Sequence, residues 1–311
     1  MRVCLMVEGQ EGVSWEQWVS LARACEEAGL EGLFRSDHYL SFGRPRERQV
    51  LDAWATLTGL AAVTSRIRLG TLVSPATFRH PSNLLKVVAT ADQISDGRVE
   101  LGLGAGWNEP EHKAYGFPFP PTRQRMDIFA EQIEIIHRSW NDPGPVDFNG
   151  EHYTLDGLVA LPKPVHTPHP NLIVGGQGGP RSVAIAARWA DEYNTNFANA
   201  AECARRKDRL ARACEKRGRE LLVFSLMTGC IVGTDGDDLG RRASKMMLQE
   251  GDPHEYLESL PDVYIWGTVQ SVPEKLAVLA KAGVDRVMMQ MQDHTDLEMV
   301  HVLGKIAELV A

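Results

Sequence analysis

The chain has 311 residues, 43% of them hydrophobic, and a net charge of -8 at pH 7. This length and apolar content suffice for a sizeable core, so we expect one α/β domain over residues 1–311. The acidic balance and scattered basic residues form no concentrated basic surface, which argues against nucleic acid as a partner. The chain start turns acidic and glycine-rich too early for a signal peptide, and no apolar run is long enough for a membrane span. We therefore expect a cytoplasmic protein.

Neither cysteines nor histidines indicate a metal site. The five cysteines are far apart, odd in number and without a CxxC pair, so we expect small buried apolar side chains and no disulfide framework: Cys4, Cys25, Cys203, Cys214 and Cys230. His166 and His169 form an HxxH pair, but they lie in a proline-rich extended segment with no acid beside them. We predict no metal ion.

Strand and helix patterns alternate through the first half of the chain. RVCLMV at 2–7 is an apolar run typical of a strand, and Ser14 stands at the N-cap position of a helix whose apolar residues follow at helical spacing. The same criteria predict further strands at 31–39, 67–75 and 99–103, and helices at 50–64, 82–95 and around 126–140.

Residues 141–170 interrupt this alternation with prolines and glycines, so we predict an insertion there with a hairpin at 147–155. The alternation then resumes, with strands predicted at 171–176, 190–196, 221–233 and 284–291 and helices at 181–189, 200–217, 272–283 and the chain end. The charged helix at 200–217 is expected to be a solvated barrel helix. Eight strands and about eight helices predict a parallel sheet closed into a (β/α)8 TIM barrel, with an open doubly wound sheet as the alternative.

In a TIM barrel the active site lies at the carboxyl ends of the strands. Unusual residues follow five of the predicted strands and would share that rim: Glu8; Ser36, Asp37 and His38; Val73, Ser74 and Pro75; the GLGAGW turn at 102–107; and Gly175 to Gly179.

Two glycine clusters follow strands, and each permits close approach of a ligand to the backbone. Gly175–Gly179 leads straight into a helix with Arg181 and Ser182 in its first turn, which is typical of a phosphate site, although a tight strand-to-helix turn would use the same glycines. The GLGAGW turn has the spacing GxGxG, not the GxGxxG of nicotinamide-binding folds, and no acidic residue follows at the required distance. Gly175–Gly179 also lacks the lysine of a P-loop.

Taken together, five sequence blocks resemble the bacterial luciferase-like flavin and deazaflavin oxidoreductases over nearly the whole chain. They are SDH at 36–38, IRLGTLVSP followed by RHP, DQISDGRVELGLGAGWNEPEHKAYG, VGGQGGPRSVAIAARWADEYN, and GTVQSVPEKLAVLAKAGVDRVMM. Within this family the chain is most similar to the branch that depends on the deazaflavin coenzyme F420, and FMN-dependent relatives are close to it.

The resemblance implies a barrel that binds the tricyclic cofactor ring at its rim. Asp37 would contact the ring, His38 would face the reacting centre, and a non-proline cis peptide at Val73 and one neighbour would support the ring from behind. The phosphate would lie at the glycine turn after the fifth strand. The implied cofactor-binding residues are Asp37, Val73, Ser74, Gly104, Gly106, Trp107, Asn108, Gly175, Gly176, Gln177, Gly178 and Gly179.

The catalytic residues are predicted to be His38 and Glu109. A histidine can donate or accept a proton as a hydride moves. Sugar-phosphate dehydrogenases of this family have a glutamate directly after the third glycine, where this chain has Trp107, so sugar-phosphate oxidation is not expected. Glu109 is the carboxylate chosen to replace that glutamate, with Glu111 as its alternative; both are also typical of the first turn of a helix.

The expected function is hydride transfer between coenzyme F420 and a small organic substrate. The alternatives are an FMN-dependent monooxygenase and a non-catalytic protein that binds a flavin or deazaflavin. The family resemblance also implies a homodimer.

Overall fold

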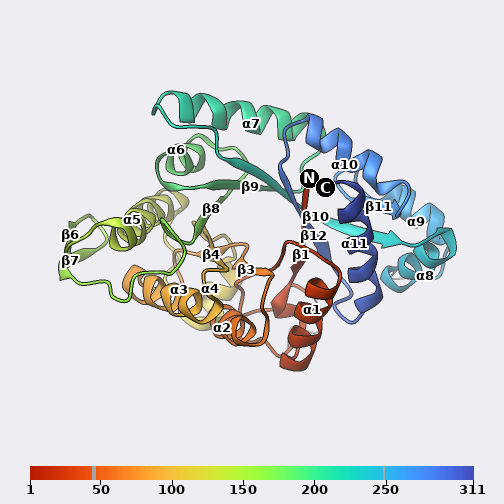
Figure 1. The fold of residues 1–311 in the computed structure, drawn as a ribbon, viewed down its shortest axis with the longest axis horizontal. Helices are drawn as coiled ribbons and strands as arrows, with labels where there is room; N and C mark the ends of the chain where they lie inside the picture. Colours follow the sequence, from red (N-terminus) through yellow and green to blue (C-terminus); the bar gives the residue numbers. More distant parts are fainter. Residues whose placement is uncertain (44–46, 248) are drawn as a thin grey trace.

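A computed structural model describes residues 1–43, 47–247 and 249–311. Its central feature is a closed barrel of parallel strands with helices around the outside (Figure 1). In order around the barrel, the strands are β1 (Arg2–Val7), β2 (Gly32–Arg35), β3 (Arg68–Thr71), β5 (Val99–Gly104), β8 (Asn171–Gly175), β9 (Glu192–Asn196), β10 (Val223–Gly233) and β12 (Arg286–Met291). Parallel pairing of β12 with β1 closes the ring, which confirms the predicted TIM barrel.

Helices connect successive strands on the outer surface. They are α1 (Trp15–Glu27), α2 (Ala53–Val63), α3 (Pro81–Ser95), α5 (Thr122–Asn141), α6 (Pro180–Trp189), α7 (Ala200–Glu215), α10 (Val272–Lys281) and α11 (Leu297–Leu309). The predicted cap of α1 is confirmed, because the Ser14 side chain accepts a hydrogen bond from the Gln17 backbone amide and the Ser14 backbone amide donates one to the Gln17 side chain. Within the described ranges, no helix combines the length and apolarity needed to cross a membrane.

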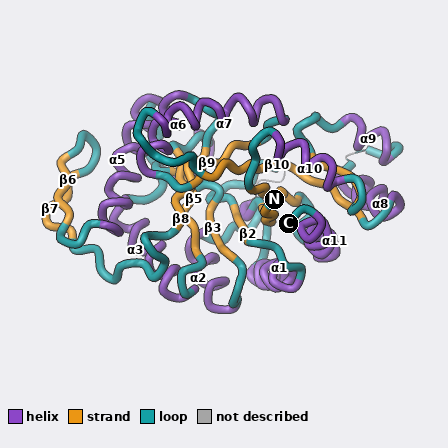
Figure 2. The backbone as a smooth tube through the Cα atoms, turned by 45° about the horizontal axis from the view of Figure 1, so that its top comes forward, coloured by secondary structure: helices purple, strands orange, loops and turns teal. Residues whose placement is uncertain are grey.

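Further elements lie in the connections between the barrel strands and helices. They are the 3-10 helix η1 (Gly9–Glu11), β4 (Ser74–Pro75), α4 (Glu109–Tyr115), β6 (Val146–Asn149), β7 (Thr154–Leu158), α8 (Gly236–Met246), α9 (Pro253–Ser259) and β11 (Ile265–Thr268). The insertion predicted at 141–170 contains the antiparallel hairpin β6–β7, which lies at the periphery beyond α5 (Figures 1 and 2). β11 extends the sheet outward from the last residues of β10.

The third predicted strand, 67–75, is wrong as a continuous strand. β3 ends at Thr71, the Leu72–Val73 peptide is cis, and the chain rejoins the sheet as β4, which pairs with β5. The missing side chain of Gly102 makes this possible, since a Cβ there would meet the Thr71 carbonyl oxygen at 2.1 Å. The second strand is also shorter than predicted, so residues 36–38 lie in the loop after it.

Alternating side chains of the strands form two apolar layers. Cys4 and Met6 of β1 face the barrel interior, where they pack with Phe34 and Met288, whereas Leu5 belongs to the larger core between strands and helices. Such alternation follows from the two-residue period of a strand. Each fully buried side chain of this size contributes roughly 1.5–3 kcal/mol, so both layers stabilise the barrel.

At the amino ends of the strands, charged groups close the barrel. Arg286 is 1% exposed, and its guanidinium contacts Glu100 at 2.7 Å, Glu192 at 3.0 Å and Glu31 at 2.7 Å. The same guanidinium carbon lies 4.9 Å from the centre of the Phe34 ring. The chain ends meet nearby, where the Met1 amino group donates to the Val310 carbonyl (Figure 2). This end of the barrel is filled, which leaves the opposite end for a ligand.

Candidate active site

A cavity of about 1050 Å³ opens at the carboxyl ends of the barrel strands. Its lining residues come from the barrel strands and from the loops that follow them, at β1, β2, β3, β5, β8, β9, β10 and β12, as expected for an active site in this fold. Among the residues predicted for the site, the structure brings to this cavity His38, Val73, Gly104, Gly106, Trp107, Gly175, Gly176 and Gln177. The others lie behind its wall or outside it.

His38 is held by a buried carboxylate. Its Nδ1 lies 2.7 Å from Oε2 of Glu111, which is fully buried on α4. The other carboxylate oxygen of Glu111 accepts hydrogen bonds from the backbone amides of Tyr39 and Leu40, the latter at 3.0 Å. One side chain thus fixes both the imidazole and the loop that carries it. Because an ionised carboxylate only accepts hydrogen bonds, Nδ1 carries the proton and Nε2 is the nitrogen left for a ligand.

The surroundings of Glu111 favour its ionised form. Burial raises the pKa of Glu111, but the hydrogen bond and charge of His38 and the two backbone amides outweigh burial, so its pKa lies below the ordinary value. Glu111 therefore remains a carboxylate at neutral pH and accepts the hydrogen bond from Nδ1 of His38.

Glu109, the predicted catalytic carboxylate, lies in a different environment. It is exposed in the first turn of α4 and does not line the cavity. Asn108 is buried at the N-cap of α4 and donates from Nδ2 to Glu111 at 3.4 Å, behind the cavity wall. The geometry thus supports Glu111, the alternative carboxylate of the sequence, as the partner of His38.

Two aromatic rings flank His38. The ring centres of Phe42 and Trp107 lie 4.7 Å and 5.7 Å from that of His38, and 5.3 Å from each other. Trp107 remains 65% exposed and lines the cavity, which places it at the cavity mouth. A substrate beside His38 would therefore meet an apolar surface.

Asp37 belongs to a buried network beneath the cavity. Its carboxylate accepts from the Ser74 hydroxyl at 2.6 Å and from Arg79 at 2.5 Å, and it is fully buried. Ser74 in turn accepts from the indole of Trp54 at 3.0 Å, and Arg79 also pairs with Asp52. Asp37 and Ser74 do not line the cavity, so the structure places them where they support Val73 from behind.

The glycines of β5 and β8 make room for Val73, which forms the back of the cavity. A Cβ at Gly104 would lie 2.9 Å from one methyl group of Val73, and a Cβ at Gly175 would lie 3.0 Å from the other. Because Val73, Gly104 and Gly175 all line the cavity, they form a smooth wall with few protruding side chains. Such a wall suits a flat ring.

The Gly175–Gly179 turn continues from this wall to the start of α6. Gly178 has a positive φ of 74°, and its amide donates to the Tyr193 hydroxyl at 2.8 Å. Gly179 is the N-cap of α6 and provides no side-chain cap. The amides of Arg181 and Ser182 therefore lack intrahelical acceptors and point toward the space before the helix, a geometry that favours an anion.

Polar side chains on the opposite wall were not predicted as site residues. Asn194, Asn196, Gln290, Gln292 and His294 line the cavity at the ends of β9 and β12. Gln290 donates to Glu8, one of the residues that the sequence predicts at the carboxyl ends of the strands. Alternating polar residues at the end of an apolar strand, as in MQMQDH, are the signal that could have found them.

The sequence of the chain matches the family model described as luciferase-like monooxygenase over residues 3–286. The chain belongs to the luciferase-like monooxygenase family. This confirms the resemblance drawn from the five sequence blocks, and it places the cavity in a family of oxidoreductases and monooxygenases.

Among individual relatives, the luciferase-like chain is 37% identical over 150 residues to an uncharacterized protein of Mycobacterium tuberculosis. That match covers 48% of this chain and about half (51%) of the relative's length. The same chain is 29% identical over 269 residues to the pyrimidine monooxygenase RutA of Yersinia enterocolitica. That second match covers 83% of this chain and 67% of the relative.

Solved structures share the luciferase-like fold over the full length. An F420-dependent secondary alcohol dehydrogenase, solved with an F420-acetone adduct, has a TM-score of 0.82 at 19% identity and covers 100% of this chain and 99% of its own. The oxygenating constituent of 3,6-diketocamphane monooxygenase from Pseudomonas putida, in complex with FMN, has a TM-score of 0.81 at 17% identity, with 100% and 98% covered. At these identities the likeness shows the fold alone.

Proposed function

We propose that this luciferase-like protein transfers a hydride between coenzyme F420 and a small organic substrate that has an alcohol and a carbonyl form. The observation that carries the proposal is the pairing of His38 with the buried Glu111 at 2.7 Å. Hydride transfer to or from a carbon–oxygen bond needs a group that gives or takes a proton at the oxygen. Nε2 of His38 is available for that exchange, and the hydrogen bond between Nδ1 and Glu111 fixes the orientation of the ring.

The cavity fits a tricyclic cofactor. Gly104 and Gly175 have no side chain that could occupy the space before Val73, and the uncapped start of α6 supplies amides for a phosphate group. We assign the ring to the Val73 wall and the phosphate to the turn at 175–179. Gly106 and Trp107 would lie beside the ring, whereas Asp37, Ser74 and Asn108 would act by fixing the wall.

Each part of the site has a distinct task. Bound F420 would supply or accept the hydride. His38 exchanges the proton with the substrate oxygen through Nε2, and Glu111 holds the imidazole in the required orientation. Phe42 and Trp107 exclude water from the reacting centre and position an apolar substituent of the substrate. The polar wall with Gln290 and Asn194 offers hydrogen bonds to the rest of the bound molecules.

FMN-dependent monooxygenation is the second candidate. The observation that favours it is the 29% identity to a pyrimidine monooxygenase over 83% of the chain. The same glycine wall and helix start would accept an FMN ring and its phosphate, so the cofactor decides between the two candidates.

A parallel titration of the purified protein with F420 and with FMN tests the proposal. We expect quenching of F420 fluorescence with saturation, weaker binding of FMN, and a change in F420 absorbance when alcohols or ketones are added. The variant His38→Asn should still bind F420 but turn over at least roughly 100-fold more slowly, because it loses the proton-exchange group.

Preference for FMN together with oxygen consumption would contradict the proposal in favour of the monooxygenase. Tight F420 binding with no redox change for any alcohol, ketone, imine or activated alkene would support the non-catalytic binding role instead.

A further inference from the structure

A second groove, outside the barrel, lies between α6 and α7 and has a volume of about 880 Å³. We infer that this groove binds the oligocarboxylate tail of the cofactor whose ring occupies the barrel cavity. The inference rests on the proposed function, since F420 carries a chain of glutamates beyond its phosphate, whereas FMN ends at the phosphate. The two helices lie side by side in Figures 1 and 2.

The groove is lined by four cations: Arg209, Arg212, Lys216 and Arg217. All four are exposed, and among the described residues none has a carboxylate oxygen within ion-pair distance. They converge on one groove although the whole chain has a net charge of -8. Cations that lack internal partners leave their charge available to an anionic ligand.

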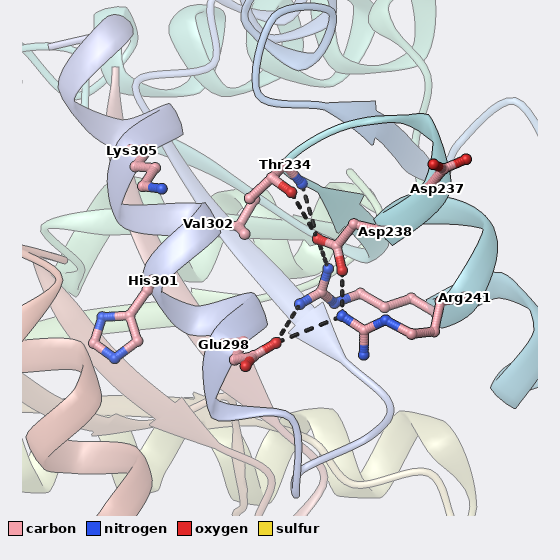
Figure 3. A pocket seen from close by; sticks show the side chains of 9 residues that line it. Thr234, Asp237, Asp238, Arg241, Glu298, His301, Val302 and Lys305 are labelled. Carbon is pink, nitrogen blue, oxygen red and sulfur yellow. Dashed lines mark hydrogen bonds and ion pairs between the residues drawn. The ribbon is translucent and has the colours of Figure 1, made fainter.

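The groove between α8 and α11 shows the contrast. There Asp238 pairs with both Arg241 and Arg242, and Arg242 also pairs with Asp296 at 2.8 Å. Figure 3 shows Asp238 of α8 and Glu298 of α11, both joined by dashed lines to Arg241. The two arginines of that groove, Arg241 and Arg242, are neutralised by carboxylates of the protein and join two helices. Among the described residues, the four cations between α6 and α7 form no ion pair of this kind.

The groove is continuous with the predicted phosphate site. Gly176 and Gln177 line the barrel cavity, and Gly178, the next residue, lines the groove. Arg209 reaches this junction, since its Nη1 donates to the Gly178 carbonyl at 3.2 Å. A ligand whose phosphate lies at the start of α6 can therefore extend over the turn into the groove without crossing the protein interior.

The spacing of the cations suits several carboxylates. From Arg209 to Lys216 the helix rises roughly 10 Å, at about 1.5 Å per residue, which about three extended residues would span. Arg212 lies in the last turn of α7 and Lys216, four residues later, is its C-cap, so the two follow one line along the groove. Successive carboxylates of a flexible tail could pair with successive cations.

Binding of deazaflavins that differ only in their tails tests the inference. We would titrate the protein with F420 carrying five or six glutamates, with F420 carrying one glutamate, and with the deazaflavin riboside that lacks phosphate and tail. We expect the long tail to bind roughly tenfold more tightly than the short one, because several exposed ion pairs each contribute a small factor. This advantage should shrink at high salt.

The triple variant Arg212→Glu, Lys216→Glu and Arg217→Glu should abolish the tail-length advantage while leaving affinity for the single-glutamate cofactor within about twofold. Arg209 is kept because it contacts the glycine turn. The charge-matched control reverses Arg23, Arg205 and Lys281, exposed cations outside the groove, and should keep the tail-length advantage.

The outcomes separate this inference from the proposed function. Equal affinity for long and short tails would overturn the tail site and leave F420 binding intact. The tail site would also be overturned if the control variant lost its preference for the long tail. If no deazaflavin binds, both fail. If the cations serve only to stabilise the carboxyl end of α7, the triple variant will lower the melting temperature without changing the ratio of the two affinities, and this too would overturn the inference.

Discussion

At the scale of single residues, two acids two positions apart have different surroundings. Glu109 and Glu111 are both on α4, but Glu109 is exposed and Glu111 is fully buried against His38. Burial of a carboxylate is costly unless hydrogen bonds satisfy it, and Glu111 receives them from an imidazole and two backbone amides. This makes Glu111 the positioning residue for the proposed proton exchange.

Exchange of Glu111 for glutamine should lower turnover roughly tenfold or more, because the imidazole loses the carboxylate that orients it and holds the proton on Nδ1. Since the pKa of Glu111 is below its ordinary value, the carboxylate is ionised at neutral pH and its contribution is lost only as the pH falls through that lowered value. The pH profile of turnover measures this contribution. The wild type should lose activity at acidic pH as Glu111 is protonated, and the profile of Glu111→Gln should lack that acidic decline.

The matched control is Glu109→Gln, which changes an exposed carboxylate on the same short helix and should leave turnover within about twofold. A large loss in Glu109→Gln together with an unaltered Glu111→Gln would restore Glu109 as the catalytic carboxylate.

At the scale of elements, the turn between β5 and α4 sets the position of the aromatic wall. Gly106 has a φ of 78°, and a Cβ at this position would lie 2.8 Å from the Thr77 hydroxyl. Both facts require glycine. Other residues are strained in the left-handed region, and a side chain at this position would also collide with Thr77. The backbone can therefore turn at Gly106 and present Trp107 to the cavity.

Gly106→Ala should lower the free energy of unfolding by about 1–3 kcal/mol, from backbone strain and the contact with Thr77. Thermal and denaturant unfolding measure the difference. Gly144→Ala, in open space after α5 and without a positive φ, should stay within about 0.5 kcal/mol of the wild type. Equal effects of the two substitutions would show that the turn does not depend on this glycine.

At the scale of the whole molecule, the barrel has one closed end and one open end. Arg286 joins carboxylates from three different parts of the chain, and Arg68 pairs with the same Glu100. Burial raises the pKa of Glu100, but Arg286 and Arg68 more than reverse this and lower it to about 2. For Glu192, burial prevails and raises the pKa.

The homodimer that the family resemblance implies stays a prediction.

Glu100→Gln should destabilise the protein by about 3 kcal/mol at neutral pH, because Arg286 loses a buried partner. The folded pKa of Glu100 is below the unfolded value of about 4.3, so its contribution is complete above roughly pH 5 and is lost as the pH falls toward 2. The difference in unfolding free energy between variant and wild type should therefore shrink on acidification.

Chemical denaturation at several pH values measures this difference. The exposed Glu298, 80% accessible, serves as control, since Glu298→Gln should change stability by less than about 0.5 kcal/mol at every pH. A difference for Glu100→Gln that stays constant between pH 7 and pH 3 would contradict the assigned role of the charge.

The sequence by itself determined the barrel, because its eight strands and the helices between them are encoded locally by apolar periodicity and by caps such as Ser14. It also determined the rim that holds His38, since parallel strands bring all their carboxyl ends to one edge. Only the tertiary structure decided which carboxylate meets His38, that Asp37 faces Arg79 beneath the cavity, and that four cations in α7 and just after it line a groove. The direction of a side chain depends on contacts between distant segments, and local spacing leaves those contacts undetermined.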